Sequence, residues 1–410
     1  MARALAHVET IKEINPIVGA DNIEMTTVLG WKVIAKKGEF NVGDKCVYFE
    51  IDSLLPKRPW SEFMENKKYK VKTMKLSKFG ENCFSQGLAL PLDLFSDEKY
   101  YSKLVRANIG DDVTDIIGVK YYVAEDNTRK ASKVATPFDT RFNRMMARHP
   151  KLAKNKLVKK MAKNKVGKKI LYFLFGSDTK DADKKFPSHF EFVNKTDETR
   201  CENIGDALFE HKEEFIQTVK LDGTSSTYIL ERKPRGKYEF YVCSRNVRMR
   251  DQNEQCYHNQ NGYGESNVYW DMAFKYHIKE VLTDLLNKHK DWEYVCIQGE
   301  SVGEGIQKNP HKLKGVQLFV FNFIDSVNGR WNSVDAKNLL AEYGLNFVPI
   351  VNEHYTLPTN MESLKLEADG DLGEYLEGAK GLREGFVYRS LDGKSSFKNV
   401  SRVYLAKLKD

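Results

Sequence analysis

The sequence predicts an α+β protein of at least two domains, and three observations lead to this prediction. The chain has 410 residues, which is long for a single domain. Hydrophobic residues make up 41% of it and aromatic residues 12%, which is enough for packed cores. The pattern changes along the chain from short strands to a basic segment, and then to mixed strands and helices. We therefore expect domains at residues 1–140 and 186–410, joined by a basic helical linker at 141–185.

Short apolar runs separated by glycines dominate the first part of the chain. Residues 25–29 and 31–35 flank Gly30, and a further run follows Gly43 at 46–51. Runs of this length, bounded by turn residues, are typical of strands in small all-β domains. We therefore expect an N-terminal β-barrel that is closed or partly closed.

A strongly basic segment follows the predicted barrel. Between Arg141 and Lys169 there are twelve Lys and Arg residues and no acidic residue, so the rest of the chain sums to 8 − 12 = −4. Apolar residues at loosely helical spacing predict one or two helices, with breaks at Gly167 and Gly176. Concentrated positive charge favours binding to nucleic acid. The alternative is a solubilising or membrane-surface helix.

Strands and helices alternate in the last part of the chain. Residues 218–221 end one strand, and 227–230 and 238–242 are expected to form a hairpin. Apolar residues at helical spacing predict a helix over 272–289 with one buried face. These patterns indicate antiparallel sheets covered by helices.

Membrane and disulfide-linked classes of protein are not supported. The longest apolar runs, such as 318–321, are far too short to cross a membrane, and the N-terminus lacks the apolar stretch of a signal peptide. The six cysteines include no Cys-x-x-Cys pair, which argues against a zinc ribbon or a redox motif. We expect a cytoplasmic protein with reduced thiols.

The run Lys220-Leu221-Asp222-Gly223 is the centre of the functional prediction. A lysine attacks phosphorus only as a neutral amine, so desolvation or a nearby cation must lower its pKa from about 10.4. Gly223 lets the backbone pass close to a nucleotide, and Asp222 can hold hydrated Mg²⁺ through its carboxylate. Taken alone, such a tetrapeptide is more often a surface turn.

Further short elements follow Lys220 in order. They are 244–246, 298–300, 319–322, 384–388 and 396–398. Each has an ordinary structural explanation when it is taken singly; Phe319, Phe321 and Phe323, for example, alternate on one strand face and would be core by default. In this order, however, they resemble the covalent nucleotidyltransferase superfamily of polynucleotide ligases and mRNA capping enzymes.

The N-terminal part narrows the resemblance. Residues 14–24, 36–40, 43–56 and 85–88 look like the OB-fold domain of a family of RNA ligases, in which this domain precedes the nucleotidyltransferase domain. Residues 195–200 look like that family's segment leading into the catalytic domain. DNA ligases and capping enzymes usually carry an OB domain after the final lysine element instead. The resemblance implies an N-terminal OB-type β-barrel and a C-terminal domain of the ATP-grasp-like ligase adenylylation type.

The resemblance also implies roles for matching residues. Lys220 would take AMP from ATP, and Phe321 would stack on the adenine. The implied catalytic residues are Lys220, Asp222, Glu300, Glu384 and Lys398. The implied ATP contacts are Arg200, Lys220, Gly223, Arg245, Glu300, Phe321 and Lys398. Mg²⁺ or Mn²⁺ would be held, through water, by Asp222, Glu300 and Glu384.

The function implied is that of an ATP-dependent RNA ligase. It would join 3′-OH and 5′-phosphate RNA ends, as in a nicked duplex, through lysyl-AMP and an adenylylated 5′ end. The expected RNA contacts are Lys36, Lys37, Lys151, Lys154, Lys159 and Lys160. Trp31 is a candidate for stacking on bases and equally for the core.

The chain departs from the superfamily pattern at two positions, and three other functions are compatible with the sequence. Many superfamily members have a second lysine where this chain has Val400, so either Lys398 acts alone or Arg402 or Lys407 reaches in. Asn322 stands where an Asp is frequent. The alternatives are a non-catalytic OB-type RNA-binding protein, a ligase that seals DNA or mixed nicks, and a guanylyltransferase.

Overall fold

The computed structural model describes residues 4–122, 155–162, 164–175, 193, 197–210, 213–245, 248–249, 258–259, 262–263 and 267–407. The chain divides into two compact units. The first unit comprises Met1–Ala124, Glu198–Leu221 and Pro349–Asp410, and the second comprises Glu125–Asp197 and Asp222–Val348. The expected domain boundaries near 140 and 186 lie outside the described residues.

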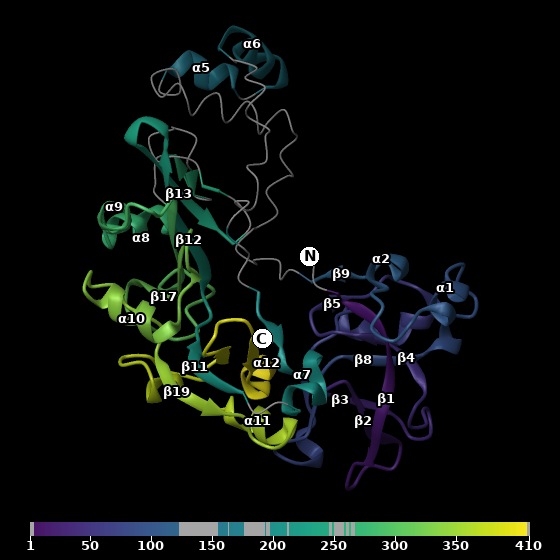
Figure 1. The fold of residues 1–410 in the computed structure, drawn as a ribbon. Coiled ribbons are helices and arrows are strands. Elements are labelled where there is room, and N and C mark those ends of the chain that lie inside the picture. Colours follow the sequence, from purple (N-terminus) through teal and green to yellow (C-terminus); the bar gives the residue numbers. More distant parts are fainter. Residues whose placement is uncertain are drawn as a thin grey trace. The chain divides into compact units, whose positions relative to one another are not determined.

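The first unit begins with a curled antiparallel sheet of strand order β3-β2-β1-β4-β8 (Figure 1). These strands are β1 (Ala6–Pro16), β2 (Ile23–Val28), β3 (Trp31–Lys36), β4 (Lys45–Phe49) and β8 (Leu88–Pro91). β1 pairs with β4 over residues 6–10 and with β2 over 11–16, so one long strand serves both halves of the curl. The predicted N-terminal barrel is therefore confirmed, in the form of a half-barrel.

Shorter elements complete the N-terminal part. They are β5 (Ser53–Leu54), η1 (Pro59–Lys67), β6 (Met74–Lys75), η2 (Ser77–Phe79), β7 (Phe84–Ser85), η3 (Leu92–Phe95), α1 (Tyr101–Arg106), α2 (Thr114–Ile117) and β9 (Lys120–Tyr121). Apolar clusters fill both sides of the curl, one including Phe49 and Trp60 and the other Trp31 and Tyr48. The suggestion that Trp31 stacks on bases is wrong, because its side chain is 0% exposed and belongs to the core.

A second five-stranded sheet belongs to the first unit, with order β10-β21-β20-β11-β19. Its strands are β10 (Thr199–Arg200), β21 (Ser396–Val400), β20 (Gly385–Ser390), β11 (Glu214–Lys220) and β19 (Ile350–Thr356). Its helices are α7 (Cys201–Ile204), η4 (Gly205–Phe209), α11 (Met361–Glu367), η6 (Leu372–Glu374) and α12 (Arg402–Lys407). Tyr388 and Phe397 stack with ring centroids 4.7 Å apart and fasten β20 to β21.

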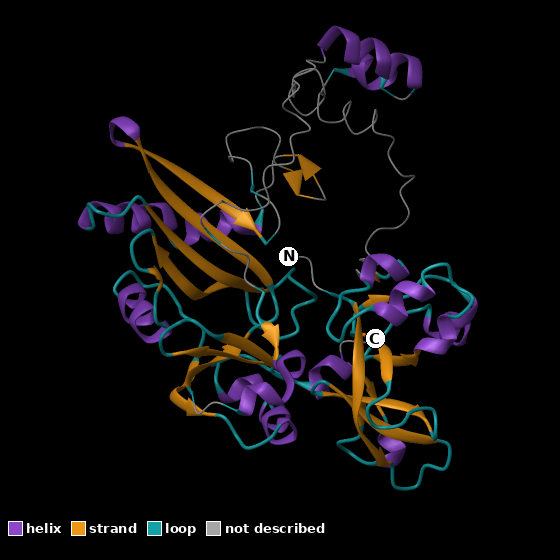
Figure 2. Cartoon of the chain, turned by 45° about the vertical axis from the view of Figure 1, so that its right-hand side comes forward, coloured by secondary structure: helices purple, strands orange, loops and turns teal. Residues whose placement is uncertain are grey.

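The second unit is built on a third sheet, of order β13-β12-β16-β17-β18. Its strands are β13 (Lys237–Ser244), β12 (Thr224–Lys233), β16 (Tyr294–Gly303), β17 (Val316–Asp325) and β18 (Gly329–Arg330). The other elements are η5 (Pro234–Gly236), β14 (His258–Asn259), β15 (Gly262–Tyr263), α8 (Val268–Lys275), α9 (Ile278–Lys288) and α10 (Ser333–Ala341). Helices α8 and α9 pack on one face of this sheet, where the largest core cluster lies (Figure 2). The predicted C-terminal sheets with helices are confirmed.

Part of the basic segment is described as two helices, α5 (Lys156–Met161) and α6 (Lys165–Phe175). Val158 and Leu171 pack together between them. The prediction of a break at Gly167 is wrong, because Gly167 lies inside α6 and its N–H donates to Asn164 Oδ1 at 2.6 Å. Asn164 has the short acceptor side chain that is typical just before a helix.

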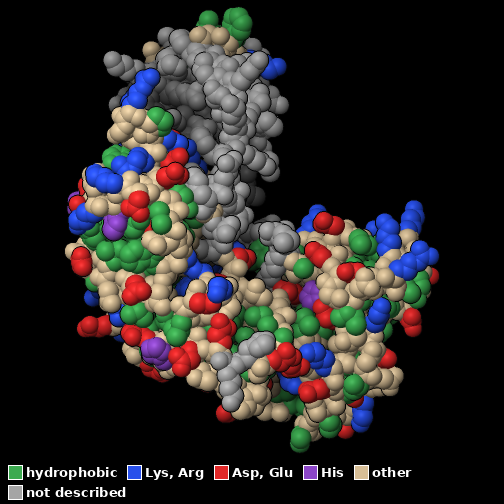
Figure 3. Space-filling model, viewed as in Figure 1, with side chains coloured by type: hydrophobic (Ala, Val, Ile, Leu, Met, Phe, Trp, Pro, Cys, Tyr) green, Lys and Arg blue, Asp and Glu red, His purple; other side chains and the backbone are tan. Residues whose placement is uncertain are grey.

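On the described surface that Figure 3 shows, Lys and Arg side chains are interspersed with Asp and Glu. This mixture agrees with a net charge that is concentrated in residues 141–169. Within the parts of the chain that the structure describes, no helix is both long and apolar enough to cross a membrane.

Candidate active site

Lys220 is the last residue of β11, and its amine is held by a carboxylate from a distant part of the chain. Lys220 Nζ lies 2.7 Å from Glu384 Oε2, and the two side chains are 26% and 15% exposed. The register pairs Lys220 with Gly385, so Glu384 stands one residue before the start of β20. A Cβ on Gly385 would lie 2.1 Å from the Asn399 carbonyl oxygen, so only glycine fits there. The strand end thus presents a partly exposed amine beside an acid.

Two of the predicted phosphate contacts lie on the Lys220 face of the same sheet. Lys398 pairs with Val387, which pairs with Thr218, two residues before Lys220. Because paired residues and residues two apart on a strand share a face, Lys398 lies on the Lys220 face. β10 runs parallel to β21 and pairs Arg200 with Lys398. The predicted nucleophile and two predicted phosphate contacts therefore share one face.

Arg200 is unusual because its charged group is largely buried. The residue is 9% exposed, and its guanidinium lies 5.8 Å from the centre of the Trp31 ring. Its Nη1 is buried with no hydrogen-bond partner among the described residues. A buried donor without an acceptor is costly, and an anionic ligand would remove that cost.

Asn203, which the sequence analysis did not single out, links the Arg200 segment to the N-terminal core. The Trp31 indole N–H donates to Asn203 Oδ1 at 2.6 Å, and Asn203 Nδ2 donates to Glu50 Oε1 at 2.6 Å. Glu50 lies 3.7 Å from His7 Nε2. No local motif marks Asn203, because its partners are 172 and 153 residues away.

His7 completes this polar chain on β1. Its Nδ1 lies 2.8 Å from Glu9 Oε1, and its other nitrogen faces Glu50. Burial lowers the pKa of His7, but hydrogen bonds to Glu50 and Glu9 outweigh burial and raise the pKa to about 9. His7 is therefore charged at neutral pH and offsets two buried carboxylates.

In the second unit, Asp222, Gly223 and Glu300 form a connected group. The Gly223 N–H donates to Glu300 Oε1 at 3.1 Å, and the Asp222 N–H donates to His311 Nε2 at 2.8 Å. A Cβ on Gly223 would lie 2.2 Å from the Ser301 carbonyl oxygen, so the glycine is required by close backbone packing. His311, fully buried, was not predicted from the sequence.

Phe321 occupies a β-bulge in β17. The register pairs Gln298 with Asn322 but Gly299 with Val320, which leaves Phe321 as the extra residue. The bulge reverses the alternation, so Leu318 and Val320 before it and Phe323 after it enter the same core. Phe321 keeps partial exposure, whereas Phe319 and Phe323 are buried. Asn322 is buried and donates to Gln298 Oε1 at 2.9 Å.

Two further arginines differ in their surroundings: Arg245 is a predicted ATP contact, and Arg402 was considered as a substitute for the lysine absent at Val400. Arg245 is exposed and forms an ion pair with Asp197 at 2.7 Å. Arg402 is buried and pairs with Glu362, so it is committed to α11. The buried Lys365 donates to the Val400 carbonyl at 2.6 Å and pairs with Glu202 at 2.6 Å. Lys398 is therefore the cation that β21 contributes to the Lys220 face.

The lysines predicted to contact RNA belong to segments other than those that carry the predicted ATP and metal residues. Lys36 and Lys37 are exposed at the end of β3, and Lys159 and Lys160 are exposed on α5. Lys151 and Lys154 fall outside the described residues. Exposed lysines of this kind are compatible with phosphate contacts.

The predicted metal-holding residues are carboxylates, the donor class that Mg²⁺ and Mn²⁺ take. Asp222 and Glu300 lie in the second unit and Glu384 in the first. Over the described part of the chain, no group of three or more His, Cys, Asp or Glu side chains is arranged to hold a metal ion directly.

Comparisons with known proteins match both ends of the chain. A family model described as an OB-fold domain matches residues 5–92, and one described as RNA ligase matches residues 213–409. Solved structures of the Naegleria gruberi RNA ligase are similar over the whole chain. A mutant with ATP and manganese is 28% identical, with a TM-score of 0.71 and 100% of both chains covered. The structure with pyrophosphate is 28% identical, with a TM-score of 0.70 and 99% of both chains covered. A search of curated protein sequences gives no match.

Proposed function

We infer that this chain, a member of the RNA ligase family with an N-terminal OB-fold domain, joins RNA ends in an ATP-dependent reaction through a covalent lysyl-AMP. One observation carries the chemistry: the Lys220 amine lies 2.7 Å from Glu384, on a sheet face shared with Lys398 and Arg200. A nucleophile that shares a sheet face with two cations is suited to an anionic phosphate.

The proposed first step is attack of Lys220 on the α-phosphorus of ATP. A P–N bond forms and the bond to pyrophosphate breaks. An ammonium paired with a carboxylate is not a nucleophile, so Lys220 must first release a proton. Glu384, which already accepts a hydrogen bond from this amine, is placed to take it. Catalysis of phosphoryl transfer is mainly positioning and charge neutralisation, and we assign those tasks to Arg200 and Lys398.

We assign Asp222, Glu300 and Glu384 to Mg²⁺ or Mn²⁺, held through water molecules. Their oxygen donors fit such a hard cation. A bound metal would supply charge neutralisation at the phosphates. The Naegleria gruberi RNA ligase, solved with ATP and manganese, supports this assignment. Phe321, at its bulge, is assigned to the adenine, and Arg245 is assigned to a further ATP contact.

The later proposed steps act on RNA. An oxygen of a 5′-phosphate attacks the adenylyl phosphorus, which transfers AMP to the RNA and returns the Lys220 amine. A 3′-OH then attacks the 5′-phosphate, a phosphodiester bond forms, and AMP leaves. We propose the two ends of a nicked duplex as the substrate, held by Lys36, Lys37 and the basic segment at 151–160.

The test is incubation of the full chain with α-labelled ATP and Mg²⁺, followed by a denaturing gel. We expect a labelled protein band that Lys220→Ala lacks. Sealing of nicked duplexes is then compared with RNA or DNA on the 3′-OH side, and RNA is expected to be joined faster. A folded chain that acquires no label contradicts the ligase assignment. Label from GTP instead of ATP would point to a guanylyltransferase.

A further inference from the structure

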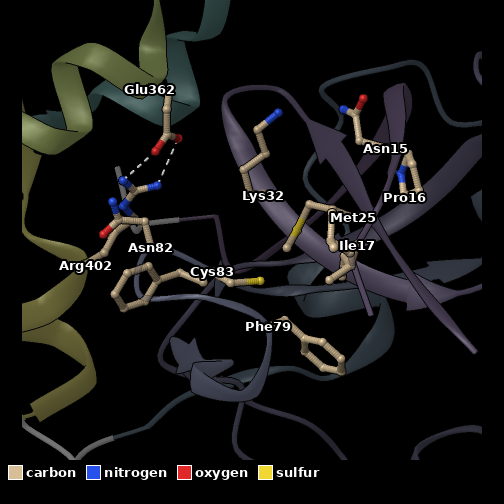
Figure 4. Close-up of a pocket in the computed structure, with 12 residues that line it drawn as sticks. Asn15, Pro16, Ile17, Met25, Lys32, Phe79, Asn82, Cys83, Glu362 and Arg402 are labelled. Atoms are coloured by element: carbon tan, nitrogen blue, oxygen red, sulfur yellow. Dashed lines mark hydrogen bonds and ion pairs between the residues drawn. The ribbon is translucent and has the colours of Figure 1, made fainter. Parts of the chain in front are cut away.

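A pocket of about 330 Å³ lies in the first unit, and none of the residues assigned to ATP lines it. It is bounded by the end of β1, by β2 and β3, by the hairpin of β6 and β7, and by α11 and α12. Figure 4 shows Ile17, Met25 and Cys83 around its middle, with Lys32 and Asn15 above and Phe79 below. Its volume lies at the lower end of the range for small-ligand sites, roughly 300–1,000 Å³.

The lining combines apolar surface with polar groups. Ile17 and Phe84 are almost fully buried, and Met25 and Cys83 are partly buried. Asn15 and Asn82, both exposed, offer amide donors and acceptors at the rim. A flat ring with hydrogen-bonding edges matches such a lining.

One wall is a fixed ion pair. Arg402 donates to Glu362 at 3.0 and 2.7 Å, and its guanidinium lies 5.4 Å from the centre of the Phe84 ring. Its Nε is buried without a hydrogen-bond partner among the described residues, and a ligand acceptor would supply one.

Lysines and aromatic rings alternate beside the pocket. Lys75 Nζ lies 5.7 Å from the centre of the Phe84 ring, and Lys78 Nζ lies 5.6 Å from that of Phe79. Lys70 and Lys72 precede them, so four lysines fall within 70–78 without an acidic residue. Cations next to aromatic rings are the surface on which single-stranded nucleic acid binds, with bases stacked and phosphates neutralised.

We propose that this pocket binds one nucleotide of the RNA substrate. The base enters against Phe79, with Asn15 and Asn82 at its edge, and the adjoining phosphates lie on Lys75 and Lys78. This proposal rests on RNA being the substrate, as proposed above, and it gives the OB-fold domain a defined RNA contact. None of these five residues was among the RNA contacts predicted from the sequence.

The first test compares Phe79→Ala and Asn82→Ala with Phe63→Ala. Phe63 is 58% exposed on η1 of the same domain and does not line the pocket. Binding of a 5′-phosphorylated single-stranded RNA oligomer to the full chain is measured by titration, and lysyl-AMP formation is measured in parallel. Because that step needs no RNA, it reports on folding and on the ATP site.

We expect Phe79→Ala to weaken RNA binding at least about fivefold, as loss of one stacked base does. Phe63→Ala should leave RNA affinity unchanged, and all of these variants should form lysyl-AMP as the wild type does. Unchanged RNA affinity in Phe79→Ala and Asn82→Ala overturns the pocket proposal. So does a raised ATP requirement for lysyl-AMP formation in these variants. Failure of the wild-type chain to form lysyl-AMP counts against the proposed function instead, so the two failures are distinguishable.

A second test locates the RNA directly. An oligomer that carries 4-thiouridine is cross-linked to the full chain, and the modified peptide is identified by mass spectrometry. We expect a cross-link within residues 79–84, lost when unlabelled RNA competes. Cross-links confined to other segments, such as 141–169, contradict the proposal.

The dependence of RNA affinity on salt concentration tests the two lysines. Replacing both Lys75 and Lys78 by Ala is expected to lower the slope of log affinity against log salt by roughly 0.7 for each lysine. Lys103→Ala on α1 should leave this slope unchanged.

Discussion

At the scale of single residues, the amine of Lys220 is held by an acid that is 164 residues further along the chain. The ion pair keeps the side chain at the strand end and only partly exposed. Lys398 and Arg200 are not neighbours of Lys220 in the sequence, but strand pairing places them on the same face of the sheet. We propose that this position among charges, together with the amine chemistry of lysine, makes Lys220 the nucleophile.

Replacing Lys220 by Arg separates charge from nucleophilicity. Arginine keeps the positive charge and can pair with Glu384, but it does not lose its proton in proteins. We expect a folded chain with no detectable lysyl-AMP, whose free energy of unfolding lies within about 0.5 kcal/mol of the wild-type value. The measurements are the labelling gel and chemical denaturation. A labelled band from the folded Lys220→Arg chain would show that another residue is the nucleophile.

Asn203 is expected to act through Arg200. Asn203→Ala removes the acceptor of the buried Trp31 N–H and one of the donors to Glu50, so the Trp31 ring next to Arg200 loses a hydrogen bond that fixes it. We expect the ATP concentration for half-maximal lysyl-AMP formation to rise roughly tenfold, since small displacements of a positioning group are costly. Sealing of pre-adenylylated RNA should change little.

Lys12→Ala is the matched control for Asn203. The exposed Lys12 also joins the N-terminal domain to the segment after Arg200, but its partner is the Asp206 carboxylate at 2.8 Å and not Trp31. It should leave the ATP requirement unchanged. Equal effects of the two substitutions would mean that the contact between the segments matters and not the position of Arg200.

At the scale of elements, the bulge in β17 decides which phenylalanine is available to a ligand. Without it, Phe319, Phe321 and Phe323 would share one face. With it, Phe323 enters the core on the α8 and α9 side while Phe321 stays partly exposed. Bulges of this kind re-aim side chains beside functional sites.

The pair Phe321→Ala and Phe323→Ala tests this division. Phe323→Ala should lower the free energy of unfolding by about 3–5 kcal/mol, because it empties a core position. Phe321→Ala should cost much less stability but raise the ATP requirement for lysyl-AMP formation. Denaturation and the labelling assay measure the two effects. The reverse pattern would remove Phe321 from the ATP site.

The buried His7 group of β1 predicts a pH dependence of stability. The pKa of His7 is about 9 in the folded protein and about 6.5 unfolded, so its stabilising contribution is complete below pH 6.5. It is lost as the pH rises through about 9, and amounts to on the order of 3 kcal/mol. His7→Gln should therefore flatten the decline of unfolding free energy between pH 6.5 and 9. Parallel curves for the two proteins would contradict the charged state of His7.

At the scale of the whole molecule, positive charge is concentrated in one segment of the sequence. Residues 141–169 carry twelve cations, and the rest of the chain is net negative. We expect this segment to supply sequence-independent affinity for phosphates, while the pocket near Phe79 contacts one nucleotide.

Neutralising Lys154, Lys159 and Lys160 to Gln tests the role of the segment. The salt slope of RNA binding should fall by roughly 2, at about 0.7 for each phosphate contact with a single strand. Lysyl-AMP formation should be unchanged. Arg at the same three positions is the control, because it keeps the charge and should keep the slope. An unchanged slope in the Gln variant would exclude the segment from RNA binding.

The sequence by itself determined the class of fold and the order of the candidate site residues along the chain. Strand periodicity and glycine turns predict a closed or partly closed N-terminal barrel, and the order of Lys220, Glu300, Glu384 and Lys398 along the chain resembles the covalent nucleotidyltransferase superfamily. The strand pattern is local, because it depends on neighbouring residues only. The roles of the four residues depend on the resemblance, because each short element has an ordinary structural explanation when it is taken singly.

Only the tertiary structure decided which residues meet. It paired Lys220 with Glu384, set Arg200 beside Lys398, buried Trp31 and brought Asn203 into contact with it. The pocket likewise joins segments from both ends of the chain. The physical reason is that strand pairing and core packing join residues far apart in sequence, and a local pattern does not say which distant residues will meet.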